Sequence, residues 1–146
     1  MCRDCQRLGK FITVADWDVD SEEAALLTRA LTRVKARNAD AQNAPSVLDR
    51  ITSGAAVLRV FYTECGPRAL YVLGFSDGNA TIRLAYSECG VSPVFVGLRE
   101  ALSVAEWMGL PKLQFFSQRG GWARAAQRFG FKRVSETEYE QEVRNV

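Results

Sequence analysis

The sequence contains no histidine, and this one absence removes several kinds of catalytic site. The imidazole of histidine titrates nearest to neutral pH, and it is a frequent zinc ligand. Without it the chain cannot form Ser-His or Cys-His nucleophile pairs or the usual zinc-hydrolase ligand sets. Any acid–base chemistry therefore has to come from carboxylates or from tyrosine.

The sequence also lacks a long apolar run and a strong net charge. No stretch approaches the roughly 18 apolar residues of a membrane span, and 19 basic against 17 acidic residues leave a net charge of +2. We therefore expect no membrane partner and no nucleic-acid partner. The charged opening from Met1 to Arg7 does not resemble a secretory signal, so we expect a cytoplasmic protein that is not secreted by a signal peptide. In that compartment the four cysteines are expected to be thiols.

The length of 146 residues fits one domain, which we expect over residues 11–146 after an N-terminal tail of residues 1–10. Asp20 and Glu23 have the spacing of a capping box at the start of the first helix. Alternating and helical patterns predict strands at 11–15, 56–63, 69–75, 81–87, 113–117, from 131 and at 136–143, and helices at about 20–38, 46–53, 93–108 and 122–128. This order predicts an α+β fold, with a mixed, mostly antiparallel sheet of six or seven strands flanked by about four helices.

The run from Ala123 to Val134 ends a helix at Gly130 and begins a strand at Phe131. Glycine adopts the left-handed conformation at a helix end without penalty, and the aromatic ring that follows plugs the sheet. This run and the order of elements resemble the GNAT family of N-acetyltransferases. The chain is similar to degenerate acetyltransferase-like proteins of tailed bacteriophages. The resemblance implies a GNAT fold with an acetyl-CoA site, in which a glycine-rich loop after the fourth strand holds the diphosphate through backbone N–H groups.

The loop at this position departs from the family pattern. Pro93 has no N–H, and Val94 and Phe95 carry side chains where phosphate oxygens would lie. Ala126 stands where the family often has a general-acid tyrosine. These departures favour an eroded acetyl-CoA site, no bound cofactor and a non-catalytic interaction or structural protein. The vestigial coenzyme contacts implied by the resemblance are Ala85, Ser87, Gly90, Val91, Ser92, Val94 and Phe95.

An active acetyl-CoA-dependent N-acetyltransferase with an atypical diphosphate loop is the alternative. Transfer would then need a carboxylate base for the amine and an acid for the leaving thiol. Glu88, at the end of the fourth strand, is the first candidate for the base and Glu64 the second, while Tyr86 is the candidate acid. Each of the three also has a simpler interpretation, as a solvated strand-end carboxylate or a half-buried tyrosine.

Two near copies of one pentapeptide, Tyr62 to Gly66 and Tyr86 to Gly90, should end at the same edge of the sheet. The beginning of the first strand should meet that edge as well. These placements would bring together four cysteines, which predict a zinc-binding module as a second alternative. Small apolar thiols at strand ends are the simpler interpretation. The candidate metal ligands are Cys2, Cys5, Cys65 and Cys89.

Several residues outside these sites are candidates for contact with a protein partner. Alternating glutamates form either an acidic docking stripe or the solvated face of an outer strand. Trp107 is expected to be partly buried, whereas Trp122 follows two glycines and could anchor a partner. If the chain is phage-encoded, the partners would include other virion proteins, and the location would be the host cytoplasm or the virion. The candidate contacts are Trp122, Arg124, Arg128, Glu136, Glu138, Glu140 and Glu142.

Overall fold

The computed structural model describes residues 10–14, 17–37, 44–76, 78–88, 93–116, 130–133 and 138–142. The elements follow the predicted order. They are β1 (Lys10–Thr13), α1 (Glu22–Arg37), α2 (Ala44–Ser53), β2 (Ala56–Thr63), β3 (Gly66–Ser76), β4 (Asn79–Ser87), α3 (Pro93–Trp107), β5 (Lys112–Phe116), β6 (Lys132–Arg133) and β7 (Glu138–Glu142). The predicted tail up to residue 9 and the helix predicted at 122–128 lie outside the described residues.

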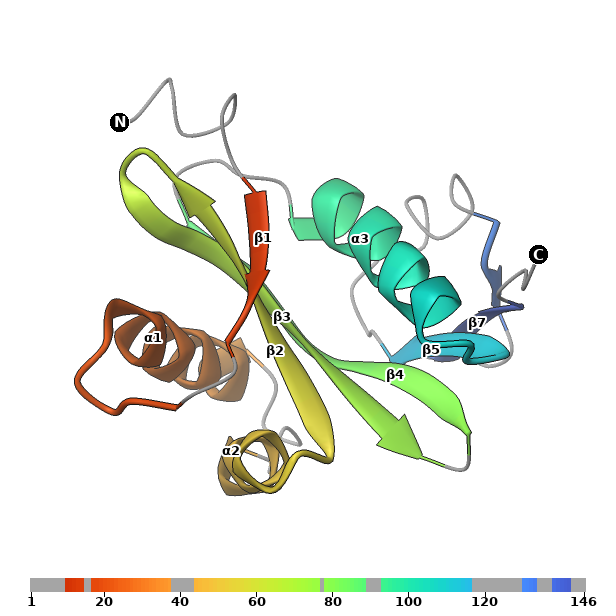
Figure 1. Cartoon of the computed structure of the whole chain (residues 1–146), viewed down its shortest axis with the longest axis horizontal. Helices are drawn as coiled ribbons and strands as arrows, with labels where there is room; N and C mark the ends of the chain where they lie inside the picture. Colours follow the sequence, from red (N-terminus) through yellow and green to blue (C-terminus); the bar gives the residue numbers. More distant parts are fainter. Residues whose placement is uncertain are drawn as a thin grey trace.

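One seven-stranded sheet runs in the order β1-β2-β3-β4-β5-β7-β6. Neighbouring strands are antiparallel except for β4 and β5, which are parallel and joined through α3. A parallel pair needs such a crossover, because the chain has to return to the same end of the sheet. The predicted α+β fold with a mixed, mostly antiparallel sheet is therefore confirmed (Figure 1).

The position of β7 differs from one of the two interpretations of the glutamate row. β7 lies between β5 and β6, so it is an inner strand, and the two-residue β6 is at the edge. The predicted position of this strand at the outer edge is wrong, because the chain passes through the edge strand β6 before it returns to pair with β5. The side chains of Glu138, Glu140 and Glu142, and all of Glu136, lie outside the described part of the chain.

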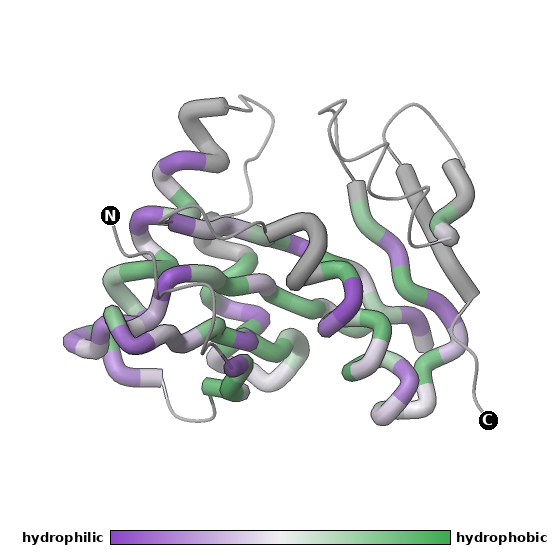
Figure 2. The backbone as a smooth tube through the Cα atoms, turned by 90° about the horizontal axis from the view of Figure 1, so that it is seen from above, coloured by the Kyte–Doolittle hydropathy of each residue, from purple (hydrophilic) through white to green (hydrophobic). Residues whose placement is uncertain are grey.

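Helices cover both faces of the sheet. On one face α1 and α2 pack against β2, β3 and β4, and on the other face α3 packs against β3, β4 and β5 (Figure 1). Seen from above, hydrophobic and hydrophilic stretches alternate along the backbone (Figure 2). The first face buries Leu26, Leu27, Ala30, Val47, Leu58, Val60, Leu70 and Val72, and the second buries Tyr71, Leu73, Ile82, Leu98, Ala101, Leu113 and Phe115. None of the described helices is long and apolar enough to span a membrane.

The start of α1 shows how a local hydrogen bond fixes a helix boundary. Ser21 Oγ accepts a hydrogen bond from the backbone N–H of Ala24 at 3.2 Å. This is the bond of an N-cap residue, which satisfies one of the free donors in the first turn. Ser21, rather than the predicted Asp20, is therefore the cap, and the helix begins one residue later, at Glu22.

The run that led to the family resemblance has the expected conformation at its end. Gly130 has φ 82°, in the left-handed region that only glycine enters readily. The ring of Phe131 is buried, and it meets Phe115 of β5 edge-to-face with 5.1 Å between ring centroids. The prediction that this aromatic residue is buried against the sheet is confirmed.

Trp107 at the end of α3 is not partly buried as predicted. Its exposed fraction is 86%, and the neighbouring Met108 is 40% exposed. The apolar side of α3 is formed by Leu98, Ala101 and Ala105, which pack on the sheet. Trp107 follows Ala105 by two positions, and two residues along a helix turn the side chain well away from that side.

Replacing Phe131 by alanine should lower the free energy of unfolding by about 3–5 kcal/mol, because it removes a buried ring and leaves a cavity beside Phe115. Chemical denaturation measures the difference. Trp107→Ala is the matched control: it removes a ring that is 86% exposed, and the change should stay within about 0.5 kcal/mol. Equal losses from the two variants would contradict the packing described here.

Candidate functional site at the end of strand β4

Strands β4 and β5 pair over only part of their length. The pairs are Ala80 with Leu113, Thr81 with Gln114, and Ile82 with Phe115. β4 then continues to Ser87 with no described strand paired along this edge. Among the described residues, the half of β4 that follows Ile82 therefore has no partner strand on the β5 side.

A β-bulge lies at this point of β4. Val72 of β3 is paired with Leu84, but the next residue, Leu73, is paired with Ile82, so Arg83 is an extra residue in β4. A bulge bends its strand and increases the local twist. The bulge at Arg83 follows Ile82 directly, the last residue of β4 that is paired with the described part of β5.

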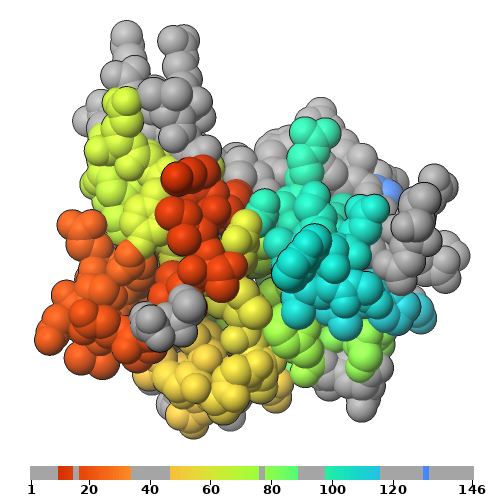
Figure 3. Space-filling view, viewed as in Figure 1, coloured from red at the N-terminus to blue at the C-terminus, as the bar shows by residue number. Residues whose placement is uncertain are grey.

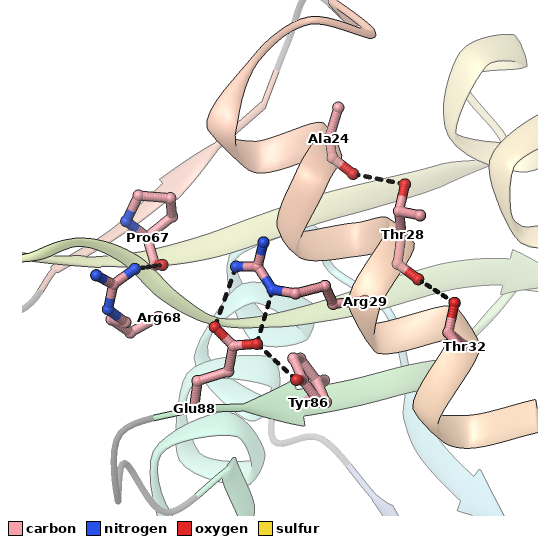
Figure 4. Close-up of polar contacts among 8 residues, drawn as sticks. All are labelled: Ala24, Thr28, Arg29, Thr32, Pro67, Arg68, Tyr86 and Glu88. Atoms are coloured by element: carbon pink, nitrogen blue, oxygen red, sulfur yellow. Dashed lines mark hydrogen bonds and ion pairs between the residues drawn. The ribbon is translucent and has the colours of Figure 1, made fainter. Parts of the chain in front are cut away.

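The carboxylate of Glu88 lies at the end of the half of β4 that follows Ile82, where it meets α1. Arg29 of α1 donates two hydrogen bonds to it, from Nε to Oε2 at 2.8 Å and from Nη2 to Oε1 at 3.0 Å. The two parallel bonds form the fork-to-fork geometry that makes arginine–carboxylate pairs specific. This ion pair joins residues that are 59 positions apart in the chain (Figure 4).

Tyr86 completes the arrangement from the same strand. Its hydroxyl group donates a hydrogen bond of 2.6 Å to Glu88 Oε2 (Figure 4). The hydrogen bonds from Arg29 lower the pKa of Glu88 below its ordinary value of 4.5; burial opposes this, while Tyr86 and the charge of Arg68 add to it. Burial, followed by the hydrogen bond to Glu88, raises the pKa of Tyr86 above 10.0. The pair is thus held as a carboxylate and a neutral phenol.

A second bulge places Arg68 beside this pair. Phe61 of β2 is paired with Ala69 and Tyr62 with Pro67, so Arg68 is an extra residue in β3. Its carbonyl oxygen accepts a hydrogen bond of 2.7 Å from the backbone N–H of Glu88. The backbone bond holds the ends of β3 and β4 together and brings a further guanidinium group to the site.

The other predicted site residues either lie outside the described residues or are not part of the arrangement of Arg29, Glu88 and Tyr86. Glu64 is exposed in the turn between β2 and β3, at the same sheet edge as Glu88. Ala85 and Ser87 are half-buried in the half of β4 that follows Ile82. The loop residues Gly90, Val91 and Ser92 lie outside the described residues; Val94 and Phe95 belong to the first turn of α3, and their side chains lie outside the description.

The predicted meeting of strand ends is confirmed, but the prediction of free thiols is wrong for Cys65. Lys10 of β1 pairs with Tyr62, and Ala69 pairs with Ser87, so β1, β2 and β4 do share one edge. Cys65 is disulfide-bonded, and its partner lies outside the described residues. In this state its sulfur is not a thiolate that could bind zinc. Cys2, Cys5 and Cys89 lie outside the described residues. The described residues contain no cluster of three or more metal-ligating side chains.

The predicted contacts Trp122, Arg124 and Arg128 also lie outside the described residues. Of the large apolar side chains that are described, Trp107 is the most exposed.

A polar cluster that the sequence did not reveal ties α3 to the sheet. Arg59 of β2 donates from Nε to Glu100 Oε1 at 2.8 Å and from Nη1 to Thr13 Oγ1 at 2.8 Å, and Nη2 also contacts Glu100. The guanidinium group lies 5.9 Å from the ring centroid of Phe11. Tyr71 donates to Glu100 Oε1 at 3.3 Å, and burial, followed by the charge of Glu100, raises its pKa.

This cluster lies between β1 and α3, which flank a shallow furrow on the face shown in Figure 3. The one signal in the sequence is a charged residue, Arg59, inside the apolar strand β2. It did not identify Glu100, which is 41 positions away.

Comparison with solved structures agrees with this architecture. A GNAT-family protein from Desulfovibrio desulfuricans matches with a TM-score of 0.71 at 13% identity, over 94% of this chain and 100% of that one. An acetyltransferase of the GNAT family from Staphylococcus aureus Mu50 matches with a TM-score of 0.67 at 8% identity, over 94% and 100%. The PaiA N-acetyltransferase of Thermoplasma acidophilum, solved in complex with coenzyme A, gives 0.61 at 12% identity, over 92% and 99%.

No protein-family model matches the sequence, and no curated protein matches it either. The structural similarity is therefore evidence about the fold. The chain has the GNAT fold, the fold of acetyltransferases.

Replacing Arg29 by glutamine should raise the pKa of Glu88 toward 4.5, because the main cause of its lowering is removed. An NMR titration of the side-chain carboxyl carbon measures this shift. Arg99→Gln, which removes an exposed arginine from α3, is the control and should leave the pKa unchanged.

The same variant has a pH-dependent effect on stability. Because the pKa of folded Glu88 is lowered, the ionised carboxylate contributes stability above pH 4.5, and this contribution is lost as the pH falls through the lowered value. The stability difference between wild type and Arg29→Gln, about 1 kcal/mol or less for a pair this exposed, should thus disappear in acid. A difference that persists in acid would mean that Arg29 acts through packing.

Proposed function

We propose that this protein is an acetyltransferase-like interaction protein with an eroded acetyl-CoA site, and that it does not transfer acetyl groups. The observation that carries the proposal is the closed arrangement of Arg29, Glu88 and Tyr86. The candidate base and the candidate acid of a transferase are bound to each other, and the base is also bound to a permanent cation.

The acid–base argument follows from proton affinity. A general base works best when its pKa lies near the working pH. The pKa of Glu88 is shifted in the opposite direction, below 4.5, and that of Tyr86 is shifted above 10.0. Neither shift favours proton transfer near neutral pH, so both support a structural role for the pair.

The beginning of α3 supports the same proposal. A helix N-terminus binds phosphate through the free N–H groups of its first turn. α3 begins with Pro93, which has no N–H to offer. A diphosphate at this position would have one backbone donor fewer than the glycine-rich loop of the family provides.

An active N-acetyltransferase that uses acetyl-CoA is the second candidate. No described strand pairs with β4 on the β5 side after Ile82, and this favours the second candidate, because a free strand edge would offer backbone groups to an extended, amide-containing ligand. In that function Glu88 would be the base, with Glu64 as the second candidate, and Tyr86 the acid.

Titration with acetyl-CoA in a calorimeter separates the two functions. For the eroded site we expect a Kd of about 1 mM or weaker and no release of coenzyme A in the presence of amines. A Kd in the low micromolar range, with turnover that Glu88→Gln abolishes and the control Glu106→Gln, at an exposed position of α3, retains, would instead establish the transferase.

The interaction part of the proposal centres on Trp107. A tryptophan that is 86% exposed, next to the partly exposed Met108, is unusual on a free surface and typical of a contact that dominates an interface. The resemblance to acetyltransferase-like proteins of tailed bacteriophages makes virion proteins the first partners to test.

Purified products of the neighbouring genes are the probes for this contact. For a genuine partner, Trp107→Ala should weaken binding about tenfold or more. Arg99→Ala, a change on the exposed side of the same helix, should have little effect. Equal affinities of wild type and Trp107→Ala would show that Trp107 is not part of the interface.

A further inference from the structure

The end of β4 is surrounded by two arginine side chains in addition to the one that forms the ion pair with Glu88. α1 supplies Arg29 and Arg33, which are one turn apart on the same helix face, and β3 supplies Arg68. Arg29 binds Glu88 directly, the charge of Arg33 acts on Tyr86, and that of Arg68 acts on Glu88. Three guanidinium groups therefore lie within electrostatic reach of one small site.

Arg68 has donor capacity that the described residues do not use. Its Nη1 donates to the carbonyl oxygen of Pro67 at 2.9 Å, whereas its Nε is buried and has no hydrogen-bond partner there. A buried donor without an acceptor destabilises a protein unless an acceptor arrives. The bulge that creates this position therefore has an energetic cost that a bound anion would offset.

Among the described residues, no carboxylate forms an ion pair with Arg33 or Arg68. Within the described part of the chain, Glu88 is the one carboxylate in an ion pair with any of these arginines. Glu22 Oε2 and Arg68 Nη1 approach Gly66, at 3.4 and 3.9 Å from the point that a Cβ atom there would occupy, but they form no ion pair with each other. Two cations thus remain available beside the Arg29–Glu88 pair.

We propose that Arg29, Arg33 and Arg68 form a binding site for an oxyanion group, a carboxylate or a phosphate, of an external ligand. Glu88 fills this site as an internal substitute in the free protein. Its two oxygen atoms take the bidentate position on Arg29 that a ligand would take, and Tyr86 donates to it as it would to a ligand oxygen.

The site is open to exchange with solvent. The side chain of Arg29 is 47% exposed, that of Glu88 is 23% exposed, and Arg33 is exposed as well. An arriving anion would displace the Glu88 carboxylate and free its hydrogen bond from Tyr86. Since Glu88 competes with the ligand, removal of its charge should strengthen anion binding.

The test compares wild type with Glu88→Gln, using inorganic phosphate and acetate as separate probes at constant ionic strength. Shifts of the arginine Nε–Hε NMR signals report binding at the site. We expect Glu88→Gln to bind one or both anions about tenfold more tightly than wild type, because charge-assisted bonds to the arginines become available. Preference for phosphate would indicate a phosphate-bearing ligand, and preference for acetate an acidic side chain.

Glu64→Gln is the matched control, since it removes the same charge from an exposed turn at the same sheet edge. The proposal is overturned if Glu88→Gln binds neither anion more tightly than wild type, or if Glu64→Gln gains as much. Arg33→Gln, a change at an exposed position that should not impair folding, should weaken binding of the preferred anion in either background, and unchanged binding of that anion would also overturn the proposal. The probes are small anions, so this test and the acetyl-CoA titration can fail separately.

Discussion

The sheet is covered by helices on both faces, and this constraint determines where every other feature of the protein can lie. Strand β3 buries Leu70 and Val72 against α1 and α2, and Tyr71 and Leu73 against the α3 side. With both faces buried, the polar backbone of these strands has to be satisfied within the sheet. Irregular backbone is then confined to strand ends and bulges. The two bulges, at Arg68 and Arg83, flank the half of β4 that follows Ile82.

The candidate site follows from this arrangement. After Ile82 the described partner strand of β4 is β3, and side chains from α1 come within reach of Tyr86 and Glu88. In this chain arginines from α1 and β3 surround the end of β4. In the free protein the charge of Arg29 is balanced by Glu88. The fold is shared with a protein solved in complex with coenzyme A, whereas the arginines at the end of β4 are the basis of the proposed anion site.

Local patterns in the sequence were sufficient for the order of the elements. The alternating pattern predicted a strand at 56–63, where β2 lies, and the helical pattern predicted a helix at about 93–108, where α3 lies. Non-local contacts were not predictable in this way. Arg29 and Glu88 are 59 positions apart, and Arg59 and Glu100 are 41 apart; each pair depends on strand register that no short pattern encodes. The inner position of β7 and the disulfide at Cys65 were missed for the same reason, since both depend on which segments meet in space.

The contacts of Arg59 have a mechanical consequence. One guanidinium group binds Thr13 on the edge strand β1 and Glu100 on α3, so it bridges the two walls of the furrow in Figure 3. These hydrogen bonds therefore link α3 to β1 through a single side chain. A ligand that moved α3 away from β1 would have to lengthen or break the hydrogen bonds of Arg59, and the displacement would be transmitted to β1 on the opposite side of the furrow.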